Sequence, residues 1–320
     1  MTDVALLLGG LVLALIALLL FVAVRSGGLV LPKRWPRLPR ASVRDSQPRL
    51  DPSEPPEARG GSASTRGPLV VLHRPRATRH PIVLAHGYFG FHAIGVAHIR
   101  PEYFRGVRRV LEALGHSVHV ARVSPTAGIQ VRAAQLCRQI ESFGAERVNI
   151  IAHSMGGLDA RYAIAHLGLG PRVASLVTIG TPHQGTPLAD CVRAAGEWRR
   201  LRRMLAAIGA DIDGLYDLTT TQMREFNRGV VDASGVMYAS VIGAAQPRVL
   251  SVNPLLVPGH AYLTRMIGAN DGIVPAQSQA WGEVFDEVAA DHWAQIGWHR
   301  SFDASVLYVS VAEQLARRSL

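Results

Sequence analysis

Apolar and polar positions divide the chain into a long apolar run, a polar stretch and a region of short alternating segments. Residues Val4–Val24 carry no charge, and a helix of that length crosses a bilayer core of ~30 Å. The stretch from Arg25 to Pro68 contains eight prolines and little apolar periodicity, which is typical of a disordered tether. We therefore expect three parts: a transmembrane anchor over 1–25, a Pro- and Arg-rich tether over 26–68 and a folded domain over 69–320.

Within the folded domain, short apolar runs alternate with amphipathic segments. The runs Pro81–Ala85, Val148–Ile151 and Val173–Ile179 are rich in β-branched residues and predict buried strands. Between them, Tyr103–Leu114 and Ile129–Phe143 place apolar residues at helical spacing. Strands that alternate with helices predict an α/β fold in which a mainly parallel sheet is covered by helices on both faces.

The positive charge belongs mainly to the N-terminal appendage. Of a net charge of +10, residues 1–80 supply 12 Lys and Arg against 5 Asp and Glu, whereas the other 240 residues supply 22 against 19. The basicity therefore does not indicate a nucleic-acid partner, and no nucleic-acid-binding motif is present. The two cysteines, Cys137 and Cys191, match no metal-site spacing and are expected to be free thiols in the core, although a disulfide between them is the alternative.

A serine stands where the second of these strands is expected to turn into a helix. Ser154 lies between Ala152 and Gly156, a variant of the G-x-S-x-G nucleophile elbow in which Ala replaces the first Gly. Such a turn strains the backbone at the serine and brings strand and helix so close that only very small residues fit beside it. A serine that merely caps the helix is the alternative. In the catalytic interpretation, the start of the helix would stabilise negative charge beside Ser154.

The loop after the first strand has the composition of a second anion-binding element. Gly87 and Gly90 follow His86 and allow the backbone to curve, so that peptide N–H groups can point into a site. Acyl transfer needs a donor from this early loop in addition to the one after the nucleophile. An ordinary glycine-rich turn is the alternative.

Three segments together resemble the α/β-hydrolase lipases of bacteria, the Pseudomonas and Burkholderia type of triacylglycerol lipase and esterase. They are Pro81–Gly90, Ala152–Gly156 and Gly180–Thr186, and the resemblance returns near Asn270–Val274 and Asp291–Gly297. It implies an α/β-hydrolase fold and an oxyanion hole made by the backbone N–H groups of Tyr88 and Met155. In that family an acidic residue two positions after the catalytic histidine serves a structural calcium site. Ala294 stands there, so we expect no calcium, no other metal and no cofactor.

A nucleophilic serine needs a histidine to accept its proton and a carboxylate to orient that histidine. In α/β-hydrolases the order along the chain is serine, acid, histidine, so His183 comes too early. His292 follows a strand-like segment, Val284–Ala289, in a loop where this fold presents its base, and the resemblance selects the same residue. His299, in an expected helix, and His260 are the alternatives.

The acid is expected in the turn Asn270-Asp271-Gly272, 21 residues before His292. Asp-Gly also favours turns for its own sake, but the resemblance places the catalytic acid at Asp271. The alternatives are Asp291, Asp286 and Asp303. Asp159 lies too close to Ser154 along the elbow helix, so we expect it to be structural, pairing with Arg161 or a neighbour.

A basic amphipathic stretch lies in the region where the family carries its mobile lid. Apolar residues recur at helical spacing from Leu188 to Ile208, with five arginines among them. A lid over about 188–230 and a plain surface helix are the two interpretations, and such a stretch also suits a membrane surface.

The apolar run at the N-terminus predicts a membrane orientation. No Lys or Arg precedes it, and the positive-inside rule places the side that carries basic residues in the cytoplasm. Basic residues directly after the run are Arg25, Lys33, Arg34, Arg37, Arg40 and Arg44. We expect an uncleaved single-pass anchor with the catalytic domain on the cytoplasmic face. A cleaved signal and an exported, periplasmic enzyme are the alternative.

Together these features predict a membrane-tethered serine hydrolase that acts on carboxylic esters of lipid-like substrates. Ser154, His292 and Asp271 would form its triad, with Tyr88 and Met155 as oxyanion donors. Two alternatives stay open: another acyl transfer, as in phospholipases, thioesterases or acyltransferases, and a catalytically silent α/β-hydrolase scaffold. The expected partners are a lipid or ester substrate and the membrane.

Overall fold

The computed structural model describes residues 76–88, 102–194, 213–246, 251–300 and 302–320. The predicted anchor, the predicted tether and most of the basic amphipathic stretch lie outside these ranges. In the part of the chain that is described, no helix is both long and apolar enough to span a bilayer.

A six-stranded sheet forms the centre of the domain, and all of its strands are parallel. The order across the sheet is β2-β1-β3-β4-β5-β6. The strands are β1 (Ile82–Ala85), β2 (Val118–Val120), β3 (Val148–His153), β4 (Val173–Ile179), β5 (Met237–Gly243) and β6 (Glu283–Val288). The predicted parallel α/β sheet is thus present. Because the strands are parallel, their carboxyl ends meet at one edge, where sites form in such sheets.

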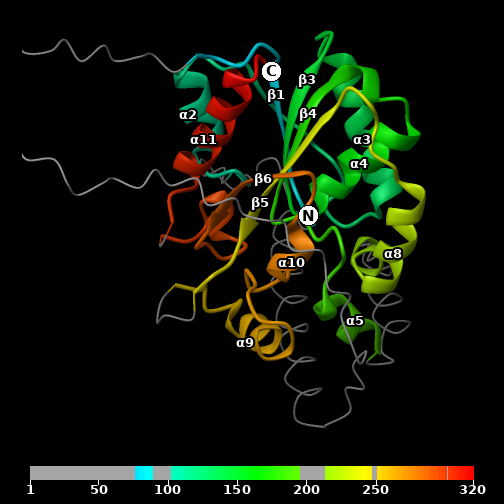
Figure 1. Ribbon diagram of the computed structural model, residues 1–320, viewed down its shortest axis with the longest axis vertical. Coiled ribbons are helices and arrows are strands. Elements are labelled where there is room, and N and C mark those ends of the chain that lie inside the picture. The colour runs from blue at the N-terminus through cyan, green and yellow to red at the C-terminus, as the bar shows by residue number, and fades with distance from the viewer. Residues whose placement is uncertain (1–75, 89–101, 195–212, 247–250, 301) are drawn as a thin grey trace, which may run out of the picture. The chain divides into compact units, whose positions relative to one another are not determined.

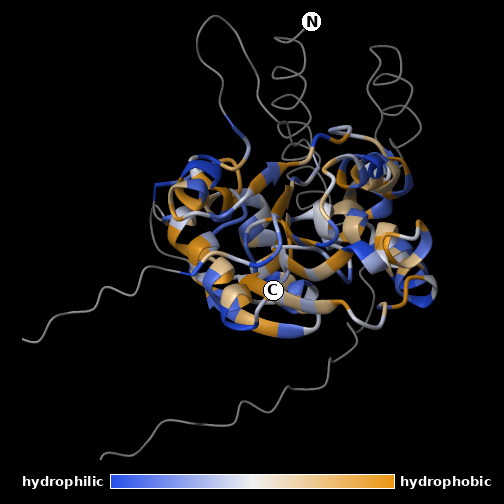
Figure 2. Ribbon diagram, turned by 90° about the horizontal axis from the view of Figure 1, so that it is seen from above, coloured by the Kyte–Doolittle hydropathy of each residue, from blue (hydrophilic) through white to orange (hydrophobic). Residues whose placement is uncertain are grey.

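Helices cover both faces of the sheet (Figure 1). On one face, α2 (Val107–Ala113) and the C-terminal α11 (Ala304–Arg317) pack on alternate strand residues such as Ile82 and Leu84. On the other, α3 (Ile129–Ser142) and α4 (Met155–His166) pack on Val83 and its neighbours. The helices carry both hydrophobic and hydrophilic residues (Figure 2), as expected for helices with one side on a sheet.

Shorter elements complete the described part of the domain. Several of them were not predicted because they are brief or rich in polar residues. They are α5 (Pro187–Ala194), α7 (Asp213–Asp217), α8 (Thr220–Gly229), α9 (Val257–Met266), α10 (Ala276–Gln279) and the 3-10 turns η1 (Gly170–Arg172), which leads into β4, and η2 (Ala294–Ile296).

Candidate active site

Ser154 occupies a sharp turn with no loop between strand and helix. Strand β3 ends at His153 and α4 begins at Met155, so Ser154 alone makes the turn. Its φ is 55° and its ψ −133°, a conformation that costs energy for any residue with a side chain. The Ser154 N–H is fixed by the carbonyl of Ile179 at 2.8 Å. This is the nucleophile-elbow geometry, and the serine is not a side-chain cap of its helix.

Close packing around the turn explains the small residues beside it. A Cβ on Gly156 would lie 2.6 Å from the Ala85 carbonyl oxygen and 2.8 Å from that of His86, closer than real contacts allow. Helix α4 can therefore approach the end of β1 only with glycine at this position. Ala152 lies on β3, fully buried, where its methyl group joins the core under α3 and α4. The replacement of the first elbow glycine is thus accommodated by the sheet.

The structure brings Ser154, His292 and Asp271 into one hydrogen-bonded line. His292 Nε2 lies 3.0 Å from Ser154 Oγ, and His292 Nδ1 lies 2.7 Å from Asp271 Oδ2. All three side chains are buried. The His292 N–H also donates to the Asp271 carbonyl at 2.8 Å, so backbone and side chain join the two loops.

Asp271 is held in a turn after β5 by donors on both carboxylate oxygens. Its Oδ1 accepts from the N–H groups of Ile273 (3.0 Å) and Val274 (2.7 Å). Its Oδ2 accepts from Gln295 Nε2 (3.1 Å) as well as facing His292. A carboxylate in such a setting stays an acceptor and can orient an imidazole.

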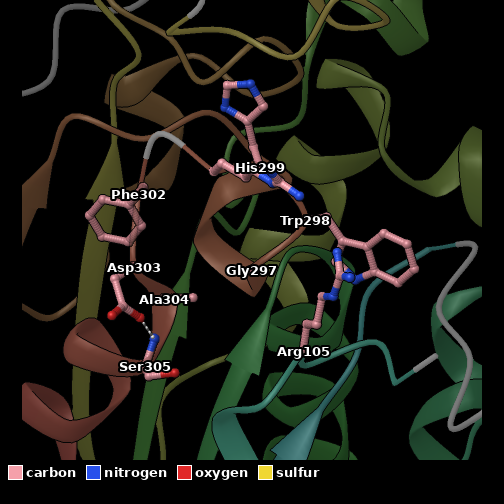
Figure 3. Close-up of a pocket in the computed structure, with 9 residues that line it drawn as sticks. Arg105, Gly297, Trp298, His299, Phe302, Asp303, Ala304 and Ser305 are labelled. Carbon is pink, nitrogen blue, oxygen red and sulfur yellow. Dashed lines mark hydrogen bonds between the residues drawn. The ribbon is translucent and has the colours of Figure 1, made fainter.

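The alternative histidines are placed elsewhere. His299 Nδ1 lies 3.5 Å from Asp291 Oδ2, and its residue is in an irregular segment, so the expected helix at His299 is wrong: α11 begins only at Ala304. Figure 3 shows His299 on the wall of a surface hollow of about 670 Å³, together with Trp298 and Arg105. His260 Nε2 bonds the Ala245 carbonyl at 3.1 Å.

His183, excluded on chain order, is fully buried beneath the elbow helix. Its Nε2 meets Thr178 Oγ1 at 3.0 Å and its Nδ1 meets Arg161 Nη1 at 3.3 Å. Burial and the neighbouring guanidinium lower the pKa of His183 well below its usual value, so the ring is neutral.

The alternative acids have structural contacts. Asp291 accepts from the backbone N–H groups of Asn253, Trp293 and Ala294, which shapes the loop that carries His292. Asp286 is exposed on β6, and Asp303 caps α11 by accepting from the Ser305 N–H at 2.9 Å.

Asp159 pairs with Arg132 of α3 and not with Arg161, which corrects the first of the expected partners. Arg132 Nη2 lies 2.8 Å from Asp159 Oδ2, and both side chains are buried. Burial raises the pKa of Asp159 to about 6, although the Arg132 charge opposes the shift. Arg132 also donates to the carbonyls of His86 (2.7 Å) and Ser124 (2.5 Å), so it joins α3, α4 and the loop after β1.

The two expected oxyanion residues belong to the two chain segments next to Ser154. Met155 is the first residue of α4, where helical N–H groups have no partner within the helix. Tyr88 follows Gly87, and a Cβ on Gly87 would lie 2.6 Å from Ser154 Cβ. The loop after β1 therefore runs directly against the nucleophile. Gly90 and most of the predicted lid lie outside the described residues.

Three residues beside Ser154, His292 and Asp271 were not singled out from the sequence. Gln295 contacts Asp271, the ring of His153 lies tilted against that of His292 with centroids 4.5 Å apart, and Tyr103 bonds His153 at 2.8 Å. His153 directly precedes Ser154, which is the one sequence signal for any of them. Within the described ranges no group of His, Cys, Asp or Glu could hold a metal ion, and Cys137 and Cys191 are free and buried, as predicted.

Comparison with known proteins identifies lipases. A family model described as a PGAP1-like alpha/beta domain matches residues 129–205. The triacylglycerol lipase of Pseudomonas fragi is 31% identical over 294 residues, which covers 76% of this chain and 98% of that protein. The triacylglycerol lipase of Vibrio cholerae is 32% identical, covering 76% of this chain and 89% of that protein.

Solved structures share the fold. The Staphylococcus hyicus lipase superposes with a TM-score of 0.61 at 19% identity, covering 76% of this chain and 97% of that one. A metagenomic carboxyl esterase superposes with a TM-score of 0.64, also at 19% identity, covering 75% and 76%. These similarities concern the arrangement of sheet and helices.

Proposed function

Because the chain belongs to the triacylglycerol lipase family of α/β-hydrolases and is a carboxylic-ester hydrolase, we propose that it cleaves lipid-like esters with a triad of Ser154, His292 and Asp271. The observation that carries this proposal is the unbroken line of contacts from Ser154 Oγ through His292 to Asp271. Its geometry is that of a nucleophile activated by an oriented base.

In the first half of the proposed reaction, Ser154 Oγ attacks the ester carbonyl while His292 Nε2 takes its proton. Asp271 keeps the Nδ1–H of His292 directed at its carboxylate and stabilises the imidazolium that forms. The N–H groups of Tyr88 and Met155 bind the oxyanion, a contribution of ~3 kcal/mol per donor. The intermediate collapses when His292 returns the proton to the departing alcohol, which leaves an acyl-enzyme on Ser154.

In the second half, His292 takes a proton from water, which attacks the acyl-enzyme carbonyl. A second tetrahedral oxyanion forms at the same donors. Its collapse returns the proton to Ser154 Oγ and releases the carboxylic acid.

The triad is tested by replacing one member at a time in the full chain purified in detergent. Ser154→Ala and His292→Ala should each lower p-nitrophenyl ester turnover by at least ~10³-fold, because triad members act as a unit. His299→Ala is the control and should retain turnover, since His299 faces Asp291. Fluorophosphonate should label the wild type and not Ser154→Ala. Turnover that survives in His292→Ala and is lost in His299→Ala would refute the base assignment, and an unlabelled wild type would indicate a silent scaffold.

We further propose that the enzyme is anchored by residues 1–25 and works at the cytoplasmic face of the membrane. The support is the uncharged run Val4–Val24, followed by six basic residues that the positive-inside rule retains in the cytoplasm. The tether of ~40 residues would reach ~35–40 Å as a random coil, which allows several poses on the bilayer. Its substrates would then be membrane or intracellular esters.

Topology is tested by fusing alkaline phosphatase, or a fluorescent protein that needs the cytoplasm, after Leu320. An inactive phosphatase and a fluorescent fusion are expected. An active phosphatase, or a mature protein that begins after Val24, would place the catalytic domain outside the cytoplasm.

A further inference from the structure

Gln295 supplies the fourth hydrogen-bonding contact of the Asp271 carboxylate. Its Nε2 lies 3.1 Å from Asp271 Oδ2, the same oxygen that faces His292 Nδ1 at 2.7 Å. Gln295 lies on η2, three residues after His292, and its side chain is fully buried. A side chain in this place acts on the reaction through Asp271 and does not touch the substrate.

Two glycines make room for the Gln295 amide. Gly180 follows the end of β4 and Gly243 ends β5, and the amide passes between them to reach Asp271. A Cβ on Gly180 would collide with Gln295 Oε1, and a Cβ on Gly243 would collide with Gln295 Nε2. The side chain is therefore held by backbone on both sides, and only its rotation by half a turn could exchange Oε1 and Nε2.

His153 is a second buried group beside the acid and the base. The Gly87 N–H donates to the Tyr103 hydroxyl at 3.2 Å, and that hydroxyl lies 2.8 Å from His153 Nδ1. The ring centroids of His153 and His292 are 4.5 Å apart. Burial, with the adjacent His292, lowers the pKa of His153 well below its usual value, so the ring is neutral.

The other end of the Gln295 amide is buried without a hydrogen bond. Within the described residues neither Gln295 Oε1 nor His153 Nε2 has a hydrogen-bond partner. A carboxylate can only accept hydrogen bonds, so the amide must present its Nε2 to Asp271. The contact with the acid therefore determines which way round the amide is held.

We propose that Gln295 is a positioning residue for Asp271. The inference rests on the proposed function of the triad. Together with the N–H groups of Ile273 and Val274, the Gln295 amide keeps the carboxylate aligned with His292 while the imidazolium forms and disappears.

The test measures kcat, KM and the pH dependence of ester turnover per active serine, titrated with a fluorophosphonate, in the full chain. Gln295→Leu should lower kcat about 10-fold with KM nearly unchanged, because alignment of the base matters most in the transition state. Gln295→Glu should move the acidic limb of kcat/KM to higher pH by about half a unit or more, since added negative charge beside Asp271 stabilises the imidazolium.

Gln279→Leu is the matched control. Gln279 is equally buried, and its amide bonds the C=O and N–H of Gly243 (3.0 and 2.7 Å) and the Val274 carbonyl (3.1 Å) without contacting the Asp271 carboxylate. Gln279→Leu should lose thermal stability while keeping the wild-type acidic limb. Gln295→Glu keeps the shape of the Gln295 side chain and remains informative if Gln295→Leu does not fold.

The two proposals fail in different ways. Ester turnover that persists in Ser154→Ala would overturn the proposed function. If Ser154→Ala is inactive but the Gln295 variants keep the wild-type kcat per active serine and the wild-type acidic limb, only the positioning role is refuted. The same holds for a Gln295→Glu variant with the wild-type kcat and acidic limb where Gln295→Leu yields no folded protein.

Discussion

At the scale of single residues, the nucleophile is confined by backbone more than by side chains. The turn at Ser154 forces an unusual φ, and the loop after β1 passes so close that Gly87 has no space for a Cβ. Two segments therefore confine the serine: the loop after β1, which carries Gly87, and the start of α4, which carries Gly156.

Gly87→Ala is expected to lower kcat/KM by about 10-fold or more. The new methyl group would lie 2.6 Å from Ser154 Cβ and 3.1 Å from its Oγ, so the serine or the loop must move, and small displacements at a reacting centre are costly. Steady-state ester kinetics on the folded variant measure this. Gly229→Ala, where no atom lies within 4 Å of the new methyl group, is the control and should keep wild-type kinetics. Equal kcat/KM in the two variants would contradict the expectation.

The central residues could be predicted because each lies in a local pattern. Ser154 is marked by the elbow spacing and Asp271 by its turn, while His292 was selected from three late histidines by chain order and resemblance. Gln295 could not be predicted, since its role depends on a gap between Gly180 and Gly243 that comes from two distant strands. Long-range complementarity of this kind leaves no periodic trace in the sequence.

At the scale of elements, one buried arginine joins three parts of the fold. Arg132 of α3 bonds Asp159 on the elbow helix α4 and the His86 carbonyl in the loop after β1. Such a contact cannot be found from the sequence, because an arginine on an otherwise amphipathic helix is usually solvent-exposed. The expected pairing of Asp159 with Arg161 failed for that reason, whereas the strands β1, β3 and β4 were predicted from apolar runs rich in β-branched residues. Strand β5 was missed, because only Val241 and Ile242 of its residues are β-branched.

Arg132→Met is expected to lower the free energy of unfolding by about 3 kcal/mol or more, since it leaves a buried carboxylate without its partner. Adding Asp159→Leu should recover part of this and not all, because the His86 and Ser124 carbonyls still lack a donor. Urea unfolding followed by circular dichroism is the measurement.

An exposed pair provides the comparison for this experiment. Arg108 and Glu112 form an ion pair on α2 in which both side chains are about two-fifths exposed. Arg108→Met should therefore change the free energy of unfolding by less than ~1 kcal/mol. A loss at Arg132 no larger than that at Arg108 would show that the buried pair does not hold the elements together.

At the scale of the whole molecule, buried neutral histidines make the folded state sensitive to acid. His183 and His153 are fully buried, and burial lowers the pKa of each well below the usual 6.5. The unfolded chain therefore binds a proton at each of these histidines at a pH where the folded chain keeps the ring neutral. Stability from this source is complete above about pH 6.5 and is lost as the pH falls.

The free energy of unfolding should decrease by up to ~1.4 kcal/mol per pH unit for each such histidine below about pH 6.5. His183→Gln should make the slope between pH 7.5 and 5.5 shallower by about that amount, as it removes one protonation that would set two cations together with Arg161. His166→Gln, on the exposed end of α4, is the control. Parallel slopes for wild type and His183→Gln in urea unfolding would refute this origin of the acid sensitivity.

The two ends of the described domain meet at the edge of the sheet remote from the site. The Arg79 N–H donates to the Leu320 carbonyl at 2.7 Å, beside the amino end of β1, whereas Ser154 lies at the carboxyl end of β3. Figure 1 shows the C-terminus near β1, with α5, α9 and α10 at the opposite end. This arrangement is useful for immobilisation, because a support or display scaffold linked through either end of the domain attaches at the same place. In both cases the triad faces the substrate solution.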